Sequence, residues 1–211
     1  MNNQIFLYKI LNNVVLESLM DIDQSLFLTL NRLHNHFFDR FFSYATQPFI
    51  WIPLYLLLLV LVIRSFRWKT FVVIIAVALM IGVSDQLANV SKSTVKRIRP
   101  TYHPDTEQMV HTVNGYKGGQ YGFYSSHAST NFAIAIFLIL LLRKRTYWIT
   151  PLLLIWASIM AYSRIYLGVH YPGDILAGII IGVLLGFLFA WLTRKIIFPH
   201  SSGTSPSGKV E

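Results

Sequence analysis

Cysteine is absent from this chain of 211 residues, and charged residues make up only 13% of it. Without cysteine, the protein can form no disulfide, no thiol nucleophile and no zinc–thiolate site. So few charges beside 54% hydrophobic residues are unusual for a soluble domain. The composition therefore predicts an all-α integral membrane protein, folded as a polytopic helical bundle.

Acidic residues are also scarce, with nine against eighteen lysines and arginines, which gives a formal net charge of +9. In a soluble protein this excess would suggest a nucleic-acid partner. Here much of the charge is explained by basic clusters at the ends of apolar runs, where basic residues set membrane topology, so we expect no nucleic acid and a membrane as the partner. Four cations lie together in one short stretch and need a separate explanation: Lys92, Lys96, Arg97 and Arg99.

Five apolar runs approach the length of about 20 residues that a helix needs to cross a bilayer. We expect them to form five transmembrane helices in one core that spans residues 48–196. In the last run, Gly178, Gly182 and Gly186 are spaced four apart, which favours close packing against another helix of the same chain. The runs cover residues 49–63, 70–90, 127–142, 148–162 and 174–192.

The segments outside this core have a different character. Residues 5–20 and 21–46 carry apolar residues at helical spacing with polar interruptions. This pattern is typical of amphipathic helices that lie at a membrane interface or on a bundle, although one of them could still cross as a sixth span. We expect residues 1–47 to form an N-terminal interfacial region, and the Ser- and Gly-rich residues 197–211 to form a disordered tail.

Basic clusters indicate how the runs are oriented. If the spans alternate strictly, the clusters share one side, which the positive-inside rule places in the cytoplasm. The other side then holds residues 95–124 and 164–173, where the remaining unusual polar residues lie. The clusters are Arg64, Arg67 and Lys69, then Arg143, Lys144 and Arg145, then Arg194 and Lys195.

Three polar segments meet on that outer side. The first carries the four cations and ends the second span, the second opens the third span, and the third joins the last two spans. Ser125 and Ser126 precede a helix, where serine caps the helix and free amides favour an anion. Pro172 suits the first turn of the last helix, which puts His170 in the loop before it and Asp174 in or near that turn.

The chemistry of this set suits a phosphate group. Guanidinium groups and a helix N-terminus match a tetrahedral oxyanion, and two histidines, His127 and His170, suit a nucleophile and a general acid near neutral pH. An aspartate beside a histidine fixes its tautomer. The set lacks the several carboxylates of a two-metal phosphatase, so we expect metal-free phosphoryl transfer with no cofactor. The cations that this side offers are Lys92, Arg99 and Arg164.

The order of these residues resembles a known family. Lys-x6-Arg-Pro, then Ser-x-His, then Ser-Arg-x5-His-x3-Asp is similar to the signature of the type-2 phosphatidic acid phosphatase superfamily, over the stretch from Lys92 to Asp174. That superfamily includes membrane lipid phosphatases, glucose-6-phosphatase and soluble vanadium haloperoxidases, and the surrounding spans fit the membrane branch. In the second motif, Tyr124 and Ser126 stand where the family usually has proline and glycine.

The resemblance implies a role for each site residue. His170 would attack the phosphorus and become phosphohistidine, Asp174 would orient it, and His127 would protonate the leaving oxygen. Lys96 and Arg97 fall outside the motif. They either attract lipid headgroups through their charge or contact the substrate directly, and the sequence leaves both roles open. The phosphate would be held by Lys92, Arg99, Ser125, Ser126 and Arg164.

The resemblance implies a metal-independent phosphatase that acts on a lipid phosphate or pyrophosphate at the outer face of a bacterial cytoplasmic membrane. Candidate substrates are undecaprenyl pyrophosphate, which small members of the family often use, phosphatidylglycerol phosphate, phosphatidic acid and a lipid A phosphate. A phosphotransferase that passes the group to a second lipid is one alternative. A lipid-binding or lipid-flipping protein without turnover is another. The pattern leaves the lipid and the oligomeric state open.

Overall fold

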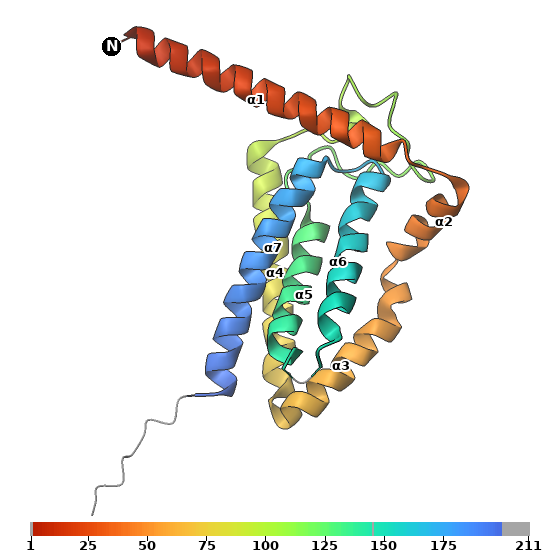
Figure 1. Cartoon of the computed structure of the whole chain (residues 1–211), viewed down its shortest axis with the longest axis vertical. Helices are drawn as coiled ribbons and strands as arrows, with labels where there is room; N and C mark the ends of the chain where they lie inside the picture. Colours follow the sequence, from red (N-terminus) through yellow and green to blue (C-terminus); the bar gives the residue numbers. More distant parts are fainter. Residues whose placement is uncertain (1, 145, 200–211) are drawn as a thin grey trace, which may run out of the picture.

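The computed structural model describes residues 2–144 and 146–199, with side chains from Val14 onward. These residues form α-helices without any β-strand, so the all-α prediction is confirmed. Of the predicted tail, residues 200–211 lie outside the described residues, whereas Ile197 still belongs to the last helix. The helices are α1 (Asn2–Asn31), α2 (His36–Ala45), α3 (Ile52–Phe66), α4 (Thr70–Val95), α5 (Ser126–Leu142), α6 (Ile149–Tyr166) and α7 (Pro172–Ile197) (Figure 1).

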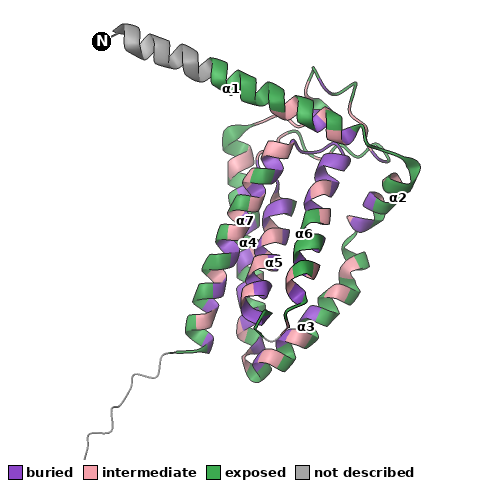
Figure 2. Cartoon of the chain, viewed as in Figure 1, coloured by how far each residue is buried: buried purple, intermediate pink, exposed green. Residues whose placement is uncertain are grey.

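Helices α4 to α7 form a bundle around α5, which is apolar and largely buried (Figure 2). Three glycines let α7 pack directly on α5. A Cβ atom at Gly178 would lie 2.6 Å from the Ser125 carbonyl oxygen, and one at Gly186 would lie 2.8 Å from the Ala133 carbonyl oxygen. Gly182 approaches an α5 carbonyl more closely still. The predicted packing of these glycines within the chain is confirmed, and it brings the N-terminal ends of α5 and α7 together.

Several described helices have the length and surface of membrane spans. Three stretches qualify, and one of them contains both α3 and α4, which run in opposite directions (Figure 1). Helix α5 is apolar but shorter. Large apolar side chains such as Leu56, Phe71 and Leu184 remain exposed, as expected for helices surrounded by lipid. The three stretches are Pro48–Val95, Ile149–Tyr166 and Pro172–Ile197.

The N-terminal region differs from the predicted pair of helices over residues 5–20 and 21–46. Helix α1 continues without a break to Asn31 and lies across the end of the bundle (Figure 1). The polar residues of this segment do not interrupt the helix. The residues that usually end a helix, glycine and proline, do not occur before residue 48. The break falls instead at residues 32–35, where the Asn35 side chain accepts a 2.9 Å hydrogen bond from the Phe38 amide and caps α2.

Asn31 fixes helix α1 to the bundle. Its buried side-chain amide donates hydrogen bonds to the carbonyls of Ile165 and Tyr166, at 3.1 and 2.9 Å, where α6 ends. Its side-chain oxygen accepts a 2.8 Å hydrogen bond from the His111 amide in the long loop after α4. One residue therefore joins α1, α6 and that loop at the same end of the bundle.

The two ends of the bundle differ as the topology prediction requires. Lys69 donates a 2.6 Å hydrogen bond to the Ile197 carbonyl, and Arg194 donates one to the Leu140 carbonyl, so these basic residues gather at one end. The loops after α4 and α6 lie at the opposite end, beneath α1 (Figure 1). Arg145, a member of one predicted cluster, lies outside the described residues.

Candidate active site

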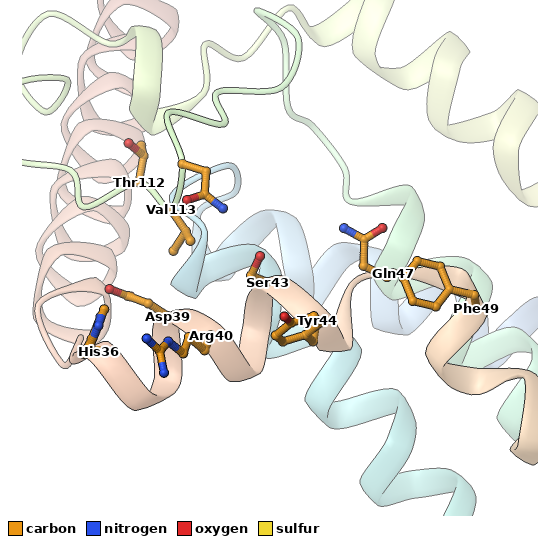
Figure 3. A pocket seen from close by; sticks show the side chains of 10 residues that line it. His36, Asp39, Arg40, Ser43, Tyr44, Gln47, Phe49, Thr112 and Val113 are labelled. Atoms are coloured by element: carbon orange, nitrogen blue, oxygen red, sulfur yellow. The ribbon is translucent and has the colours of Figure 1, made fainter.

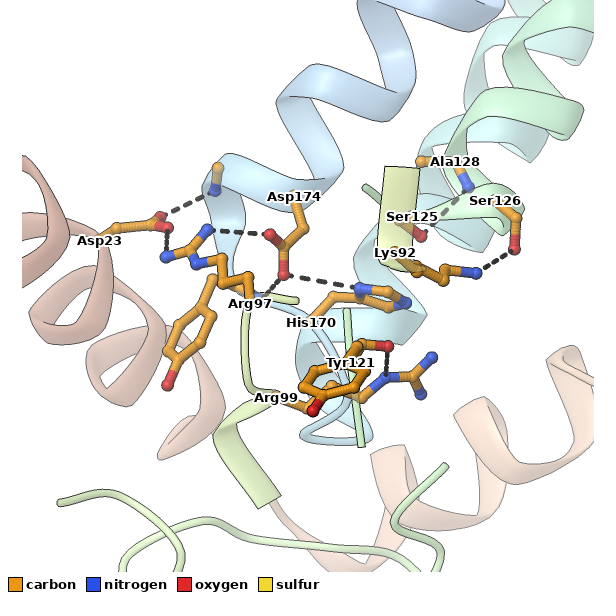
Figure 4. Close-up of polar contacts among 12 residues, drawn as sticks. Asp23, Lys92, Arg97, Arg99, Tyr121, Ser125, Ser126, Ala128, His170 and Asp174 are labelled. Carbon is orange, nitrogen blue, oxygen red and sulfur yellow. Dashed lines mark hydrogen bonds and ion pairs between the residues drawn. The ribbon is translucent and has the colours of Figure 1, made fainter. Parts of the chain in front are cut away.

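His170 and Asp174 lie at the centre of the candidate site (Figure 4). Helix α7 begins at Pro172, so Asp174 lies in its first turn and His170 in the loop before it, as predicted. Both side chains are buried, and His170 Nδ1 lies 3.5 Å from Asp174 Oδ2. Burial lowers the pKa of His170 to about 4, against the opposing effect of Asp174. The imidazole is therefore neutral at neutral pH.

The carboxylate of Asp174 is held from two further directions. Its Oδ2 atom accepts a 3.0 Å hydrogen bond from the Tyr171 amide, and its Oδ1 atom accepts one of 2.8 Å from Arg97. The backbone carbonyl of Asp174 accepts a 3.1 Å hydrogen bond from the Ser125 amide, which links the starts of α5 and α7. With both oxygens engaged, the carboxylate keeps one orientation toward His170.

Arg97 is a residue of the candidate site that sequence reasoning missed, since its guanidinium is paired with Asp174. Its attraction of lipid headgroups stays a prediction. Its guanidinium also donates a 2.6 Å hydrogen bond to Asp23 on α1 and lies 4.4 Å from the centre of the Tyr171 ring. Burial alone would lower the pKa of Arg97, but the carboxylates of Asp174 and Asp23 outweigh it and raise that pKa. The one signal for Arg97 in the sequence was its place in the cluster of four cations. Lys96 is the member of that cluster that remains exposed.

The start of α5 carries the two predicted serines. The Oγ atom of Ser125 accepts a hydrogen bond of 3.4 Å from the Ala128 amide, so Ser125 caps the helix as predicted. The Nζ atom of Lys92 on α4 lies 3.4 Å from Ser126 Oγ (Figure 4). The serine that departs from the usual glycine of the second motif therefore contacts a predicted phosphate ligand. A lysine beside a helix N-terminus favours an anion.

Two arginines complete the cationic set. The prediction placed Arg164 in the outer loop, but α6 extends to Tyr166, so Arg164 lies in its last turn. Its side chain is only 4% exposed, and its Nε atom donates a 3.2 Å hydrogen bond to Ser163. The Nε atom of Arg99 donates a 3.0 Å hydrogen bond to the Tyr121 carbonyl (Figure 4), and burial lowers the pKa of Arg99.

His127 lies in the first turn of α5 and is exposed. It lines two cavities, of about 300 and 260 Å³, and Arg164 lines the larger of these. It is also close enough to His170 and Arg164 for their charges to interact. The structure therefore brings all eight predicted residues to one end of the bundle.

Gly122 is a second residue that sequence reasoning missed. A Cβ atom at this position would lie 3.4 Å from both His170 Nδ1 and Asp174 Oδ2, and 2.9 Å from Arg99 Cγ. Its amide donates a 2.9 Å hydrogen bond to the Arg97 carbonyl, which holds the loop in place. Glycine thus allows the loop to cover the His–Asp pair closely.

These features define an integral membrane protein of helical fold. The end of the bundle that carries the loops after α4 and α6 holds a buried His–Asp pair beside several cations. Within the described residues, no three side chains of histidine, aspartate or glutamate are grouped to hold a metal ion. Guanidinium groups and a helix N-terminus at one site suit a phosphate oxyanion.

The chain belongs to the PAP2 superfamily, whose family model matches residues 68–198. It is 41% identical to the lipid A 4′-phosphatase of Bacteroides thetaiotaomicron over 199 residues, which cover 92% of this chain and 87% of that relative. It is 34% identical to the lipid A 4′-phosphatase of Porphyromonas gingivalis over 81% of this chain and 72% of the relative. The resemblance inferred from the motifs is confirmed.

A solved structure shares the fold. The first transmembrane PAP2 type phosphatidylglycerolphosphate phosphatase from Bacillus subtilis superimposes with a TM-score of 0.63 at 22% sequence identity. The match covers 85% of this chain and 88% of that one.

Proposed function

We propose that this chain is a membrane lipid phosphatase that removes a phosphate group from lipid A or a closely similar phosphorylated saccharide lipid. The observation that carries the proposal is the buried pair of His170 and Asp174 beside Lys92, Arg99 and Arg164. Two relatives named lipid A 4′-phosphatase, aligned over most of their length, favour this substrate over the undecaprenyl carrier preferred from the motifs alone.

In the first step, His170 attacks the phosphorus atom through Nε2. Asp174 faces the other ring nitrogen at 3.5 Å, which favours the tautomer protonated on Nδ1 and leaves the Nε2 lone pair free. The N–P bond forms as the P–O bond to the lipid breaks. His127 gives its proton to the departing oxygen, which leaves as a hydroxyl group.

The cations act on the charge of the transferring phosphoryl group. Positive groups fixed around its oxygens stabilise the transition state without reorganisation of solvent. Asp174 offsets the positive charge that His170 acquires as phosphohistidine. The phosphate ligands in this scheme are Lys92, Arg99 and Arg164, with the hydroxyl of Ser125 and the amide of Ser126.

In the second step, a water molecule attacks the phosphorus of phosphohistidine. His127, neutral after the first step, accepts a proton from this water. The N–P bond breaks, inorganic phosphate leaves, and His170 returns to its neutral form.

Charge and exposed apolar surface support one arrangement in the membrane. We propose that α3 to α7 are five spans, with residues 48–196 as the phosphatase core and the basic end in the cytoplasm. The site then lies at the outer face of a bacterial cytoplasmic membrane. Helix α1 exposes Val15, Leu19 and Ile22 and lies in the interface, within an N-terminal region of residues 1–47. A reporter enzyme fused at Met1 tests this, because activity in the cytoplasm would contradict it.

Phosphate release from defined lipids tests the function. Purified protein with EDTA is expected to release phosphate from lipid A faster than from undecaprenyl pyrophosphate. His170→Ala should abolish release, whereas His103→Ala, a change in the outer loop, should leave it unchanged. Loss of activity in EDTA would overturn the metal-free scheme. Near-normal turnover by His170→Ala would show that His170 is not the nucleophile. Labelled phosphate on a second lipid, instead of in solution, would indicate a phosphotransferase.

A further inference from the structure

A polar groove of about 570 Å³ runs along α2, outside the catalytic residues (Figure 3). One wall is the face of α2 that carries Asp39, Arg40, Ser43 and Tyr44. The opposite wall is the loop segment 112–114. Figure 3 shows the Ser43 side chain directed from α2 toward this loop. The predicted roles of the motif residues do not account for this groove.

The groove continues into the catalytic space. Four of its lining residues, including Ser43 and Gln47, also line the 300 Å³ cavity that contains His127 and Arg164. A molecule whose phosphate lies at Arg164 can therefore extend along α2 without leaving the protein surface.

The other exit from the catalytic space has a different lining. The 260 Å³ cavity shares Thr46 and His127 with the catalytic cavity. Its other lining residues include polar ones, Asp85, Ser126, Thr130 and Asn131, and the larger apolar and aromatic residues Trp51, Tyr55 and Met160. These larger apolar and aromatic groups suit the hydrocarbon part of a lipid. Of the two directions, the one along α2 has the more polar lining and suits the polar part of the same lipid.

The groove offers the groups that recognise a sugar. Asp39 is a fixed acceptor, because the Tyr166 hydroxyl donates to its Oδ1 atom at 2.7 Å and His111 Nε2 lies 2.8 Å from the same atom. Burial raises the pKa of the Asp39 carboxyl, but these hydrogen bonds outweigh it and lower that pKa. Arg40 adds exposed donors, and Tyr44, 63% exposed, offers an aromatic face.

We propose that the groove along α2 binds the saccharide that carries the phosphate of the lipid substrate. This inference rests on the proposed function, since it identifies the part of the headgroup next to the scissile bond. It makes α2 and residues 112–114 determinants of specificity. Lipid phosphates without a saccharide would use the catalytic cavity and leave the groove empty.

Binding and turnover with two lipids test the proposal. The variant Arg40→Ala/Tyr44→Ala is compared on lipid A and on phosphatidic acid, which has no saccharide. We expect the KM for lipid A to rise by about tenfold, as for loss of one or two hydrogen bonds and a ring contact, and the KM for phosphatidic acid to stay within about twofold. Arg32→Ala/Tyr147→Ala, which removes an exposed arginine and an exposed tyrosine outside the groove, is the matched control. An equal effect on both lipids, or none on either, would overturn the proposal.

A binding measurement separates this proposal from the proposed function. In a His170→Ala background, the double variant should weaken lipid A binding by about tenfold and leave phosphatidic acid binding unchanged. If wild-type protein releases no phosphate from any lipid, the proposed function fails. In that case the dissociation constants for lipid A and phosphatidic acid still decide whether the groove proposal is correct.

Discussion

The guanidinium of Arg97 donates a 2.8 Å hydrogen bond to the buried carboxylate of Asp174. Its second donor reaches Asp23 on α1 at 2.6 Å, and Asp23 also accepts a 2.8 Å hydrogen bond from the Gly173 amide. Helix α1 thus contacts the start of α7 directly at Gly173, and it reaches Asp174 through Arg97. An N-terminal helix that lies across the bundle is in this way part of the surroundings of the candidate active site.

Replacing Arg97 should therefore impair turnover more than binding. In Arg97→Ala, the buried Asp174 loses its charge partner and is free to turn away from His170, so we expect kcat to fall by about 10- to 100-fold with KM within about threefold. Steady-state kinetics on lipid A measure this. Lys96→Ala removes the same charge from the exposed neighbouring residue and should change kcat by less than about twofold. A rise in KM in both variants with normal kcat would instead support headgroup attraction.

The pH at which His170 titrates should reflect the burial of its side chain. Because burial lowers its pKa to about 4, we expect the ring to stay neutral from pH 7 down to about pH 5. Asp174 raises this pKa, so Asp174→Asn should shift the titration to still lower pH. NMR titration of protein labelled in histidine, with the resonance assigned by His170→Gln, measures both values. A midpoint near or above the ordinary 6.5 would show that the site is hydrated and the nucleophile is protonated in mild acid.

A side chain at Gly122 should damage the site. The Cβ atom would lie 2.9 Å from Arg99 Cγ and in contact with the His–Asp pair, so Gly122→Val must displace one of them. We expect kcat/KM to fall by about 100-fold, as for a shift of about 1 Å in a catalytic group. Gly119→Val is the matched control, since no atom lies within 4 Å of its added Cβ. Equal activity of the two variants would mean that the loop moves away from the site during turnover.

Two glycine-to-alanine changes in long helices should have opposite effects on stability. Gly82 in α4 has open space where a Cβ would lie, so Gly82→Ala should raise stability by about 0.5–1 kcal/mol through helix propensity. Gly182→Ala places the same methyl group against the Ser129 carbonyl, so it should lower stability by about 1–3 kcal/mol. Thermal unfolding in detergent compares the two. A higher Tm for both would show that α5 and α7 can separate without cost.

Much of the fold follows from local pattern. The runs predicted over residues 70–90 and 127–142 lie within or nearly coincide with α4 and α5, because a long apolar segment must satisfy its backbone hydrogen bonds as a helix. The position of Pro172 also located His170 in a loop and Asp174 in or near the first turn of the last helix. The predicted helix boundary near residue 21 was wrong, because polar residues in an amphipathic helix resemble a break only in the absence of its packing partners.

The sequence by itself determined the helical membrane class, the family and the set of motif residues, since each depends on composition or on short spacings along the chain. Tertiary structure alone decided that Arg97 contacts Asp174 and Asp23, that Gly122 lies against His170, and that α2 forms a groove beside the candidate phosphate site. These contacts join segments up to about 150 residues apart, such as Asp23 and Gly173. No periodicity or spacing encodes them, because they depend on how α1 crosses the bundle and how the long loop folds over it.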